Sequence, residues 1–234
     1  MDVLIAGCSF SDREKYKGKN GETYDGIDIW PELVCNHFGW DLKKNLSEAG
    51  GSNELIIDRL TVELVSNGDD YDIVILGLTQ WERTWIPGLN LYVNLANPPE
   101  HRLWIPGENH KMKSGEDPVI NYFREFDYKD IQFRNIIESN ISKILQFKAI
   151  CNSMDKKLIV VQIAEPLNSG YTERVISHKL FEELQFIIGF PFLPRLYGCT
   201  GVETLIKNWK ELTVDNHPNA EGHKVIAEWV IKNL

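Results

Sequence analysis

Three short apolar runs alternate with stretches of helical periodicity along the chain. The runs 2–7 (DVLIAG), 72–78 (DIVILGL) and 157–164 (KLIVVQIA) are rich in β-branched residues and apolar without alternation. Strands with this pattern are buried on both faces, as in the parallel sheets of α/β proteins. We therefore predict that they form the centre of a parallel sheet, with the more polar run 41–47 (DLKKNLS) as a strand nearer its edge.

Helical segments lie between and after these runs. The first, SNELIIDRLTVELVSNG, has either Ser52 or Asn53 to cap its start and Gly68 to end it. Its apolar positions are Leu55, Ile56, Leu60, Leu64 and Val65. Further helices are predicted at about 128–153, 177–188 and 221–233. Strands that alternate with helices predict an α/β protein.

The stretch 84–126 has no clear period and holds several Pro, Gly and aromatic residues. A loop of this length is usually functional or disordered, and its tryptophans favour an ordered one. Trp81, Arg83 and Trp85 near its start are candidates for contacting an acyl or sugar group of a substrate. The alternative is that the aromatic residues form only the core of the loop. They are Trp81, Trp85, Tyr92 and Trp104.

Composition limits the classes of function. The 234 residues are 43% hydrophobic, enough for one sizeable core, so we predict a single domain spanning 1–234. The net charge of −9 and the lack of clustered Lys and Arg argue against a nucleic-acid partner. Neither a dinucleotide-binding GxGxxG motif nor a P-loop motif occurs, so no cofactor is expected.

Cysteine spacing and the first residues bear on the compartment. Cys8, Cys35, Cys151 and Cys199 form no CxxC pair, so reduced thiols are the default and no zinc ribbon is expected. The first residues, MDVLIAGCSF, carry an acid where a signal peptide needs positive charge, and their apolar run is too short to span a membrane. We expect a cytoplasmic protein without a membrane span.

The turn after the first predicted strand, LIAGCSFSD, holds the first chemical candidate. Ser9 would lie at the carboxyl end of the sheet, where open α/β folds bind ligands, and the glycine before it predicts a group packed close to the backbone. The alternative is that a serine here caps a helix, and Ser11 suits that role because SDRE forms a capping box with Glu14. The neighbouring Cys8 is expected to be buried and structural.

The segment VDNHPNAEGHKVIAEWV supplies an acid and an imidazole before the last predicted helix. A serine nucleophile needs a base and a carboxylate that orients it, and His217 and Asp215 would serve. The alternative is a histidine in a surface turn and an aspartate that caps the helix. His223 and Glu221 could join Asp215 around a metal, but the dependable i, i+4 histidine pair is missing. We therefore predict no metal and expect His223 to pack the helix.

Together these segments resemble the conserved blocks of the SGNH (GDSL-like) hydrolases over most of the chain. AGCSFSD resembles the first block, with Ser9 as the nucleophile. NLSEAGGSN looks like the second, in which the N–H of Gly50, or failing that of Gly51, would point at the oxyanion. The third block normally reads Gly-x-Asn-Asp, but this chain has LGLTQWER, so Thr79 stands in place of the asparagine and Thr79 or Gln80 would have to donate instead.

The last block of the family places Asp three residues before His, whereas Asp215 is two before His217. The resemblance implies a three-layer α/β/α sandwich with a mostly parallel, flavodoxin-like sheet. It implies a serine-type esterase with a Ser9, His217 and Asp215 triad. Its oxyanion hole would be formed by Ser9, Gly50 and either Thr79 or Gln80. The substrate would be a small-molecule or carbohydrate ester, with acetyl as one candidate acyl group.

The two altered blocks leave other classes of function open. One is a binding protein that keeps the fold but has lost efficient chemistry. Another is a structural or assembly protein, in a homo-oligomer or a complex, that uses the stretch 84–126 as its interface. Labelling of Ser9 by a serine-reactive probe distinguishes the enzyme from the binding protein. The assembly protein would instead be recognised by a stable oligomer or complex whose contacts include residues 84–126.

Overall fold

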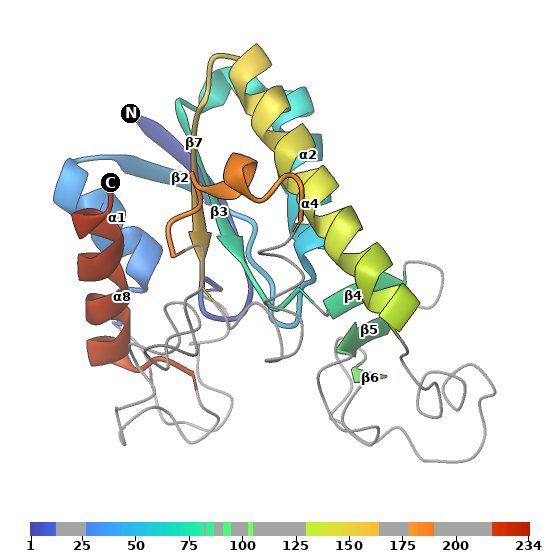
Figure 1. The fold of residues 1–234 in the computed structure, drawn as a ribbon. Helices are drawn as coiled ribbons and strands as arrows, with labels where there is room; N and C mark the ends of the chain where they lie inside the picture. Colours follow the sequence, from blue (N-terminus) through green and yellow to red (C-terminus); the bar gives the residue numbers. More distant parts are fainter. Residues whose placement is uncertain are drawn as a thin grey trace.

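Four parallel strands form the centre of the computed structural model, in the order β2-β1-β3-β7 (Figure 1). They are β1 (Asp2–Ala6), β2 (Asp41–Asn45), β3 (Ile73–Leu78) and β7 (Lys157–Gln162). The structure describes residues 1–12, 27–81, 83–86, 91–94, 103–104, 130–163, 178–189 and 217–234. All three predicted apolar strands are confirmed, and the polar strand β2 lies at the edge of the sheet as expected. Only β1 and β3 are central, however, because β7 ends the four-stranded order on the other side and is flanked there by a single bridge to Ile188.

Two helices cover each face of this sheet (Figure 1). On one face lie α1 (Trp30–Phe38) and α8 (Ala220–Lys232), and on the other α2 (Asn53–Asn67) and α4 (Asp130–Ser153). Side chains alternate across a strand. Val3 and Ile5 of β1 therefore pack in the core under α1 and α8, whereas Leu4 and Ala6 pack in the core under α2 and α4. The result is the predicted three-layer α/β/α sandwich. None of the described helices is both long and apolar enough to cross a membrane.

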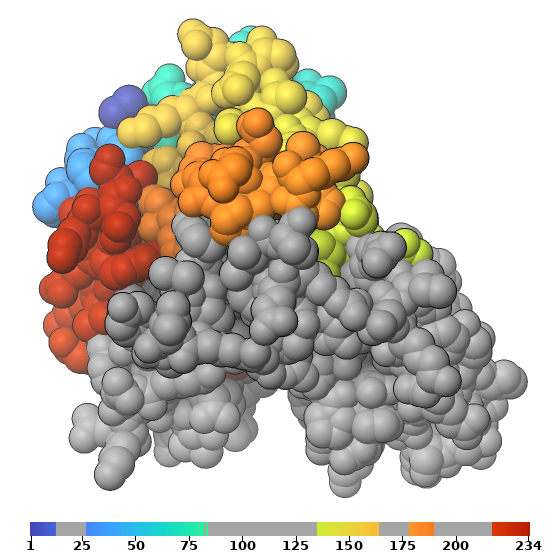
Figure 2. Space-filling view, viewed as in Figure 1, coloured from blue at the N-terminus to red at the C-terminus, as the bar shows by residue number. Residues whose placement is uncertain are grey.

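The prediction of a helix at 177–188 is wrong. The described part of this segment holds only the short helix η5 (Glu182–Leu184), after which Ile188 pairs with Val161 of β7. The apolar side chains that suggested a helix are used differently, because Leu184 and Ile187 fill the core while Ile188 extends the sheet. In Figure 2 the segment 178–189 lies between α4 and α8.

The stretch predicted as an irregular loop also contains regular structure. Three short strands form an antiparallel sheet in the order β4-β5-β6. They are β4 (Arg83–Ile86), β5 (Leu91–Asn94) and β6 (Leu103–Trp104). The strands are too short for their period to stand out from the sequence around them. The rest of 84–126 lies outside the described residues.

The ends of the helices follow from local chemistry. Ser52, not Asn53, caps α2, because its hydroxyl accepts the Leu55 N–H at 3.3 Å. At its other end Gly68 has a φ of −60°, so it does not provide the left-handed ending that the sequence predicted, and the chain continues into the helix η2 (Gly68–Asp70). The helix α1 was not predicted, since Ile29 rather than a polar cap precedes it.

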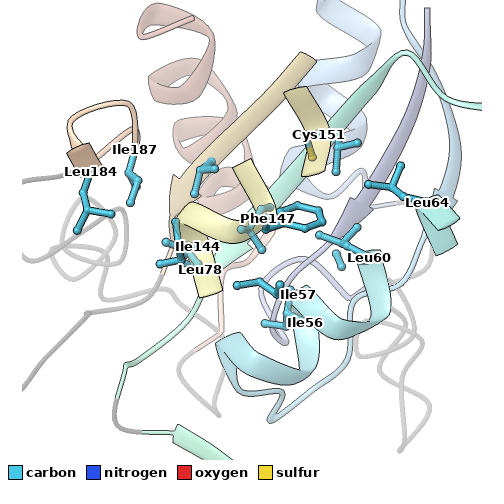
Figure 3. Packing of buried hydrophobic residues seen from close by; sticks show 14 of the residues in the cluster. Ile56, Ile57, Leu60, Leu64, Leu78, Ile144, Phe147, Cys151, Leu184 and Ile187 are labelled. Atoms are coloured by element: carbon cyan, nitrogen blue, oxygen red, sulfur yellow. The ribbon is translucent and has the colours of Figure 1, made fainter. Parts of the chain in front are cut away.

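The core between α2, α4 and the sheet is centred on Phe147 of α4 (Figure 3). Leu60 and Leu64 of α2 lie on one side of its ring, and Ile144 and Leu78 lie on the other. All five side chains are fully buried. Truncating a buried phenylalanine to alanine typically costs about 3–5 kcal/mol. This packing therefore anchors both helices over the end of β3.

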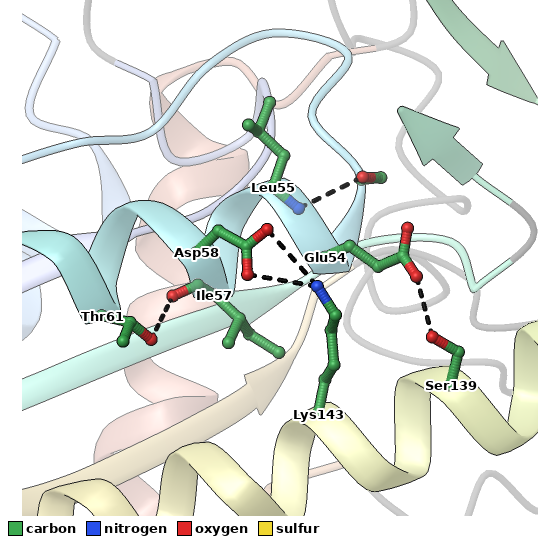
Figure 4. A network of polar contacts seen from close by, with 8 residues as sticks. Glu54, Leu55, Ile57, Asp58, Thr61, Ser139 and Lys143 are labelled. Carbon is green, nitrogen blue, oxygen red and sulfur yellow. Dashed lines mark hydrogen bonds and ion pairs between the residues drawn. The ribbon is translucent and has the colours of Figure 1, made fainter. Parts of the chain in front are cut away.

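At the surface the same two helices are joined by polar contacts (Figure 4). The Lys143 ammonium lies 3.1 Å and 3.3 Å from the two carboxylate oxygens of Asp58. The Ser139 hydroxyl donates to the Glu54 carboxylate at 2.8 Å. The Asp58 side chain is 63% exposed, so water competes with its ion pair. Apolar burial, not these contacts, supplies most of the stability of the α2–α4 pair.

Candidate active site

The turn after β1 brings Ser9 to the carboxyl end of the sheet. The Ser11 N–H donates to the Cys8 carbonyl at 2.8 Å and closes this turn. A Cβ atom on Gly7 would lie 2.7 Å from the Ser11 hydroxyl oxygen, and one on Gly77 of β3 would lie 3.3 Å from it. The group expected close to the glycine backbone is thus the side chain of Ser11.

Ser11 connects this turn to α1. Its hydroxyl is fully buried and accepts the Trp30 indole N–H at 3.1 Å. Residue 12 is not helical, and Glu14, the partner in the predicted capping box, lies outside the described residues. Cys8 is 2% exposed, in agreement with its prediction as a buried residue.

The Ser9 hydroxyl lies 2.9 Å from Nε2 of His217. This distance is within hydrogen-bond reach, as the sequence predicted, and is what proton transfer from a serine to an imidazole requires. The His217 ring also packs edge-on against Phe10, with 5.3 Å between ring centroids. Asp215, the predicted third member of the triad, lies outside the described residues.

The helix that follows His217 is fixed in place by a second histidine. Asn219 caps α8 by accepting the Gly222 N–H at 3.0 Å. One turn further on, Nδ1 of the fully buried His223 accepts the Trp30 backbone N–H at 3.2 Å. Burial, with a smaller contribution from His217, lowers the pKa of His223 to about 3, so the ring is neutral. His223 therefore packs the helix, as expected.

The loop after β2 is tied closely to the turn that carries Ser9. The Glu48 N–H donates to the Gly7 carbonyl at 3.1 Å. The side-chain NH₂ group of Asn45, the last residue of β2, donates to the Ser11 carbonyl at 2.8 Å. The Ala49 N–H donates to the Asp12 carboxylate at 3.2 Å. Three hydrogen bonds thus set the position of this loop relative to the nucleophile.

Two backbone N–H groups at this edge are candidate donors to an oxyanion. Neither the Ser9 N–H nor the Gly50 N–H donates a hydrogen bond to the residues that the structure describes. Gly50 has a φ of 80°, a conformation that favours glycine. Gly51 is less suitable, because its N–H already donates to the Glu48 carbonyl at 3.2 Å.

The two candidates after β3 differ in accessibility. Thr79 is fully buried, and its N–H donates to the Asn53 side-chain oxygen at 2.8 Å. Its hydroxyl is sealed from solvent and has no hydrogen-bond partner in the described part of the chain. Gln80 is partly exposed, and its side-chain oxygen accepts the Arg83 Nε–H at 3.1 Å. Of these two side chains, only that of Gln80 has surface to offer a substrate.

Trp81 is not placed to contact a substrate. Its side chain is fully buried, and its indole N–H donates to the Gln162 side chain at 3.1 Å. This burial favours the alternative, a core position, over the prediction that Trp81 contacts a substrate. Arg83 is partly exposed, and the side chain of Trp85 lies outside the described ones.

Three buried amides near the site were not singled out from the sequence. Asn53 was named only as an alternative helix cap, and Asn140 and Gln162 were not named at all. All three side chains are buried and hydrogen-bonded to residues 79–81. The one available signal was Gln162, a polar residue at the end of an apolar strand. Within the described residues, no group of His, Cys, Asp or Glu side chains could hold a metal ion.

Since β2, β1 and β3 are parallel neighbours, their carboxyl ends lie along one edge of the sheet. Ser9 follows β1, Gly50 follows β2 and Gln80 follows β3. The candidate nucleophile and oxyanion donors thus come from three adjacent strand ends, with His217 joining them from the start of α8.

Comparisons with known proteins bear on this architecture. No family model and no curated protein matches the chain. Among solved structures, it is similar to the psychrotrophic esterase EstA from Pseudoalteromonas sp., with a TM-score of 0.50, 13% identity and coverage of 99% of this chain and 94% of the esterase. The chain shares the fold of this esterase.

Two further solved structures, with lower scores, are similar to the chain. One is TesA, with a TM-score of 0.49, 13% identity and coverage of 100% of this chain and 98% of TesA. The other, from Desulfitobacterium hafniense DCB-2, is assigned to the lipolytic proteins of the G-D-S-L family. It has a TM-score of 0.46 and 13% identity, and the match covers 100% of this chain and 99% of that protein. Likeness at 13% identity describes the fold, and the residues of the site carry any conclusion about activity.

Proposed function

We propose that this protein is a serine-type carboxylic ester hydrolase. The observation that carries the proposal is the 2.9 Å separation between the Ser9 hydroxyl and Nε2 of His217, at the carboxyl edge of an SGNH-fold sheet. A serine hydroxyl is a weak nucleophile at neutral pH and needs an adjacent base that removes its proton. The pair satisfies this requirement without a metal or a cofactor.

The reaction would proceed through an acyl-enzyme. The Ser9 oxygen attacks the ester carbonyl carbon as His217 takes the hydroxyl proton, and the carbonyl oxygen becomes an oxyanion. Collapse of this intermediate breaks the ester C–O bond, and His217 returns the proton to the leaving alcohol. Water, deprotonated by His217, then attacks the acyl group and restores Ser9. Asp215 is proposed to orient the His217 ring, as the family resemblance implies.

Three donors are proposed for the oxyanion. The N–H groups of Ser9 and Gly50 are available, and Gln80 is a better third donor than Thr79, whose N–H is occupied and whose hydroxyl is sealed. Such donors stabilise charge that develops in the transition state, and one of them is typically worth about 10²–10³ in kcat. This assignment gives Gln80 the role that the asparagine of the third block has in the family.

The proposed substrate is an ester of a small molecule or a carbohydrate. A short-chain p-nitrophenyl ester tests the acyl side independently of the natural alcohol. A panel of acetylated sugars then tests the carbohydrate assignment, and hydrolysis of the synthetic ester alone would contradict that finer assignment while leaving the esterase in place.

The deciding experiment combines active-site labelling with turnover. A fluorophosphonate probe should modify Ser9, located by peptide mass spectrometry, and Ser9→Ala should abolish both labelling and p-nitrophenyl ester hydrolysis. Ser153→Ala is the matched control, because this exposed serine near the end of α4 donates only to a backbone carbonyl. Wild-type turnover equal to that of Ser9→Ala, without labelling, would overturn the proposal in favour of a binding protein.

A further inference from the structure

We propose that Asn53 is a positioning residue that fixes Gln80 relative to the rest of the oxyanion hole. This inference rests on the proposed function and adds a residue to it. Asn53 is the first residue of α2 and follows the loop that carries Gly50. Its side chain reaches across to the loop after β3, so one residue connects the strand ends that supply two proposed donors.

The Asn53 side chain binds both backbone groups of Thr79. Its oxygen accepts the Thr79 N–H at 2.8 Å, and its NH₂ group donates to the Thr79 carbonyl at 3.4 Å. The same NH₂ group donates to the Asn140 side-chain oxygen at 3.0 Å. The side chain is 1% exposed, so water does not compete for these bonds. Thr79 is held as a strand residue is held by a neighbouring strand.

Two more buried amides complete the network. The NH₂ group of Gln162 donates to the Thr79 carbonyl at 3.0 Å, while its oxygen accepts the Trp81 indole N–H at 3.1 Å. The NH₂ group of Asn140 donates to the Trp81 carbonyl at 3.2 Å. These bonds use the oxygen and the NH₂ group of all three amides. A fully satisfied buried network favours one geometry, because each misplaced member leaves a costly unpaired group.

This network fixes the two residues on either side of Gln80 and leaves Gln80 itself at the surface. Its amide orientation is set separately by Arg83, whose Nε–H donates to the Gln80 side-chain oxygen at 3.1 Å. Because arginine has donors only, the oxygen of Gln80 must face it, and the NH₂ group is directed elsewhere. A donor held in this way needs little reorganisation when the oxyanion forms.

The test separates positioning from stability. Asn53→Ala should lower kcat about tenfold or more with little change in KM, since a misplaced donor affects mainly charge that develops in the transition state. If Asn53 acts through Gln80, the roughly hundredfold cost of Gln80→Ala should shrink in the Asn53→Ala background. Ile57→Ala is the matched control, because this buried α2 residue packs in the apolar core and has no polar side-chain atom that could join the amide network. It should lower Tm and leave kcat unchanged.

Two results would overturn the positioning role. One is a folded Asn53→Ala variant with wild-type kcat, and the other is a pair of independent, multiplying effects for Asn53→Ala and Gln80→Ala. If Asn53→Ala does not fold, Asn53→Asp takes its place, because it keeps the acceptor for the Thr79 N–H but places a carboxylate against a carbonyl. If the wild type is active, either of the two overturning results contradicts only the role of Asn53 and leaves the esterase proposal intact. A wild type as inactive as Ser9→Ala would overturn both.

Discussion

The two faces of the sheet hold the site by different means. On the face of α1 and α8, apolar packing carries the helix that brings His217 to Ser9, and the buried bond between Trp30 and His223 joins the two helices. On the face of α2 and α4, a set of buried amides holds the segment 79–81. The helix α8 is held mainly by buried apolar surface, whereas the segment 79–81 is held by directional hydrogen bonds.

The difference matches what each part has to do. In the proposed mechanism, His217 would receive a proton and then deliver it to a different atom, so docking its helix by non-directional apolar contacts would be sufficient. An oxyanion donor acts only if it already points at the developing charge. Hydrogen bonds weaken steeply away from linearity, so they fix direction where apolar contacts cannot. Under the proposed function, the buried amides of the α2 and α4 face lie next to Gln80, the proposed donor whose orientation affects the rate.

The largest effect should come from removing either Ser9 or His217, the proposed nucleophile and base. Ser9→Ala and His217→Ala should each lower kcat for a short-chain ester by about 10³-fold or more, because neither works without the other. The double variant should be no slower than the singles, as measured by steady-state kinetics. Independent effects would mean that the two residues do not act as one unit.

A smaller effect is expected at the turn shared by both faces. Gly7→Ala would place a Cβ atom 2.7 Å from the Ser11 hydroxyl oxygen, so the turn that carries Ser9 must shift. We expect kcat to fall about ten- to a hundredfold and stability to fall by about 1–3 kcal/mol. Gly39→Ala is the control. Its φ of 66° strains an alanine, but no atom lies within 4 Å of the added Cβ, so the variant tests backbone strain without a clash. It should lower Tm without changing kcat.

The buried histidine of the α1 and α8 face should make stability depend on pH. The pKa of His223 falls from an ordinary 6.5 to about 3 in the folded protein, so the unfolded chain binds a proton that the folded chain does not. Stability from this group is therefore complete above pH 6.5 and is lost as pH falls toward 3, by up to about 1.4 kcal/mol per pH unit.

His223→Asn removes this titration and retains an acceptor for the Trp30 N–H. Urea unfolding at a series of pH values should give a flatter stability curve for the variant than for wild type over this range. Equal slopes would show that the His223 ring is not held neutral by burial.

The smallest effect is expected at the surface of the α2 and α4 face. Asp58→Ala removes the ion pair with Lys143, both partners of which are partly or fully exposed. Exposed pairs contribute about 0.2–1 kcal/mol and are screened by salt. Urea unfolding should show a loss within that range that disappears at high salt. A loss above 2 kcal/mol would mean that polar surface contacts on this face matter as much as its buried amides.

The sequence predicted the parts of the fold and site that depend on local pattern. Buried parallel strands leave long apolar runs, and Ser9 and His217 stand beside such elements in motifs of recognisable composition. Partners contributed by distant segments left no comparable pattern. Asn53 and Gln162 bind Thr79, and Asn140 binds Asn53 and Trp81, only because α2, α4 and β7 pack together. The pairing of Ile188 with β7 depends in the same way on the finished sheet.

Ser9 and His217 stand 208 positions apart, so their contact closes one of the longest loops that the chain can form. We expect this contact to form late in folding, because contacts of such separation are costly to form before the intervening structure exists. At a synthesis rate of about 5–20 residues per second, His217 is synthesised about 10 to 40 seconds after Ser9. In a refolding experiment, ester hydrolysis should therefore return after the sheet signal and report the docking of α8.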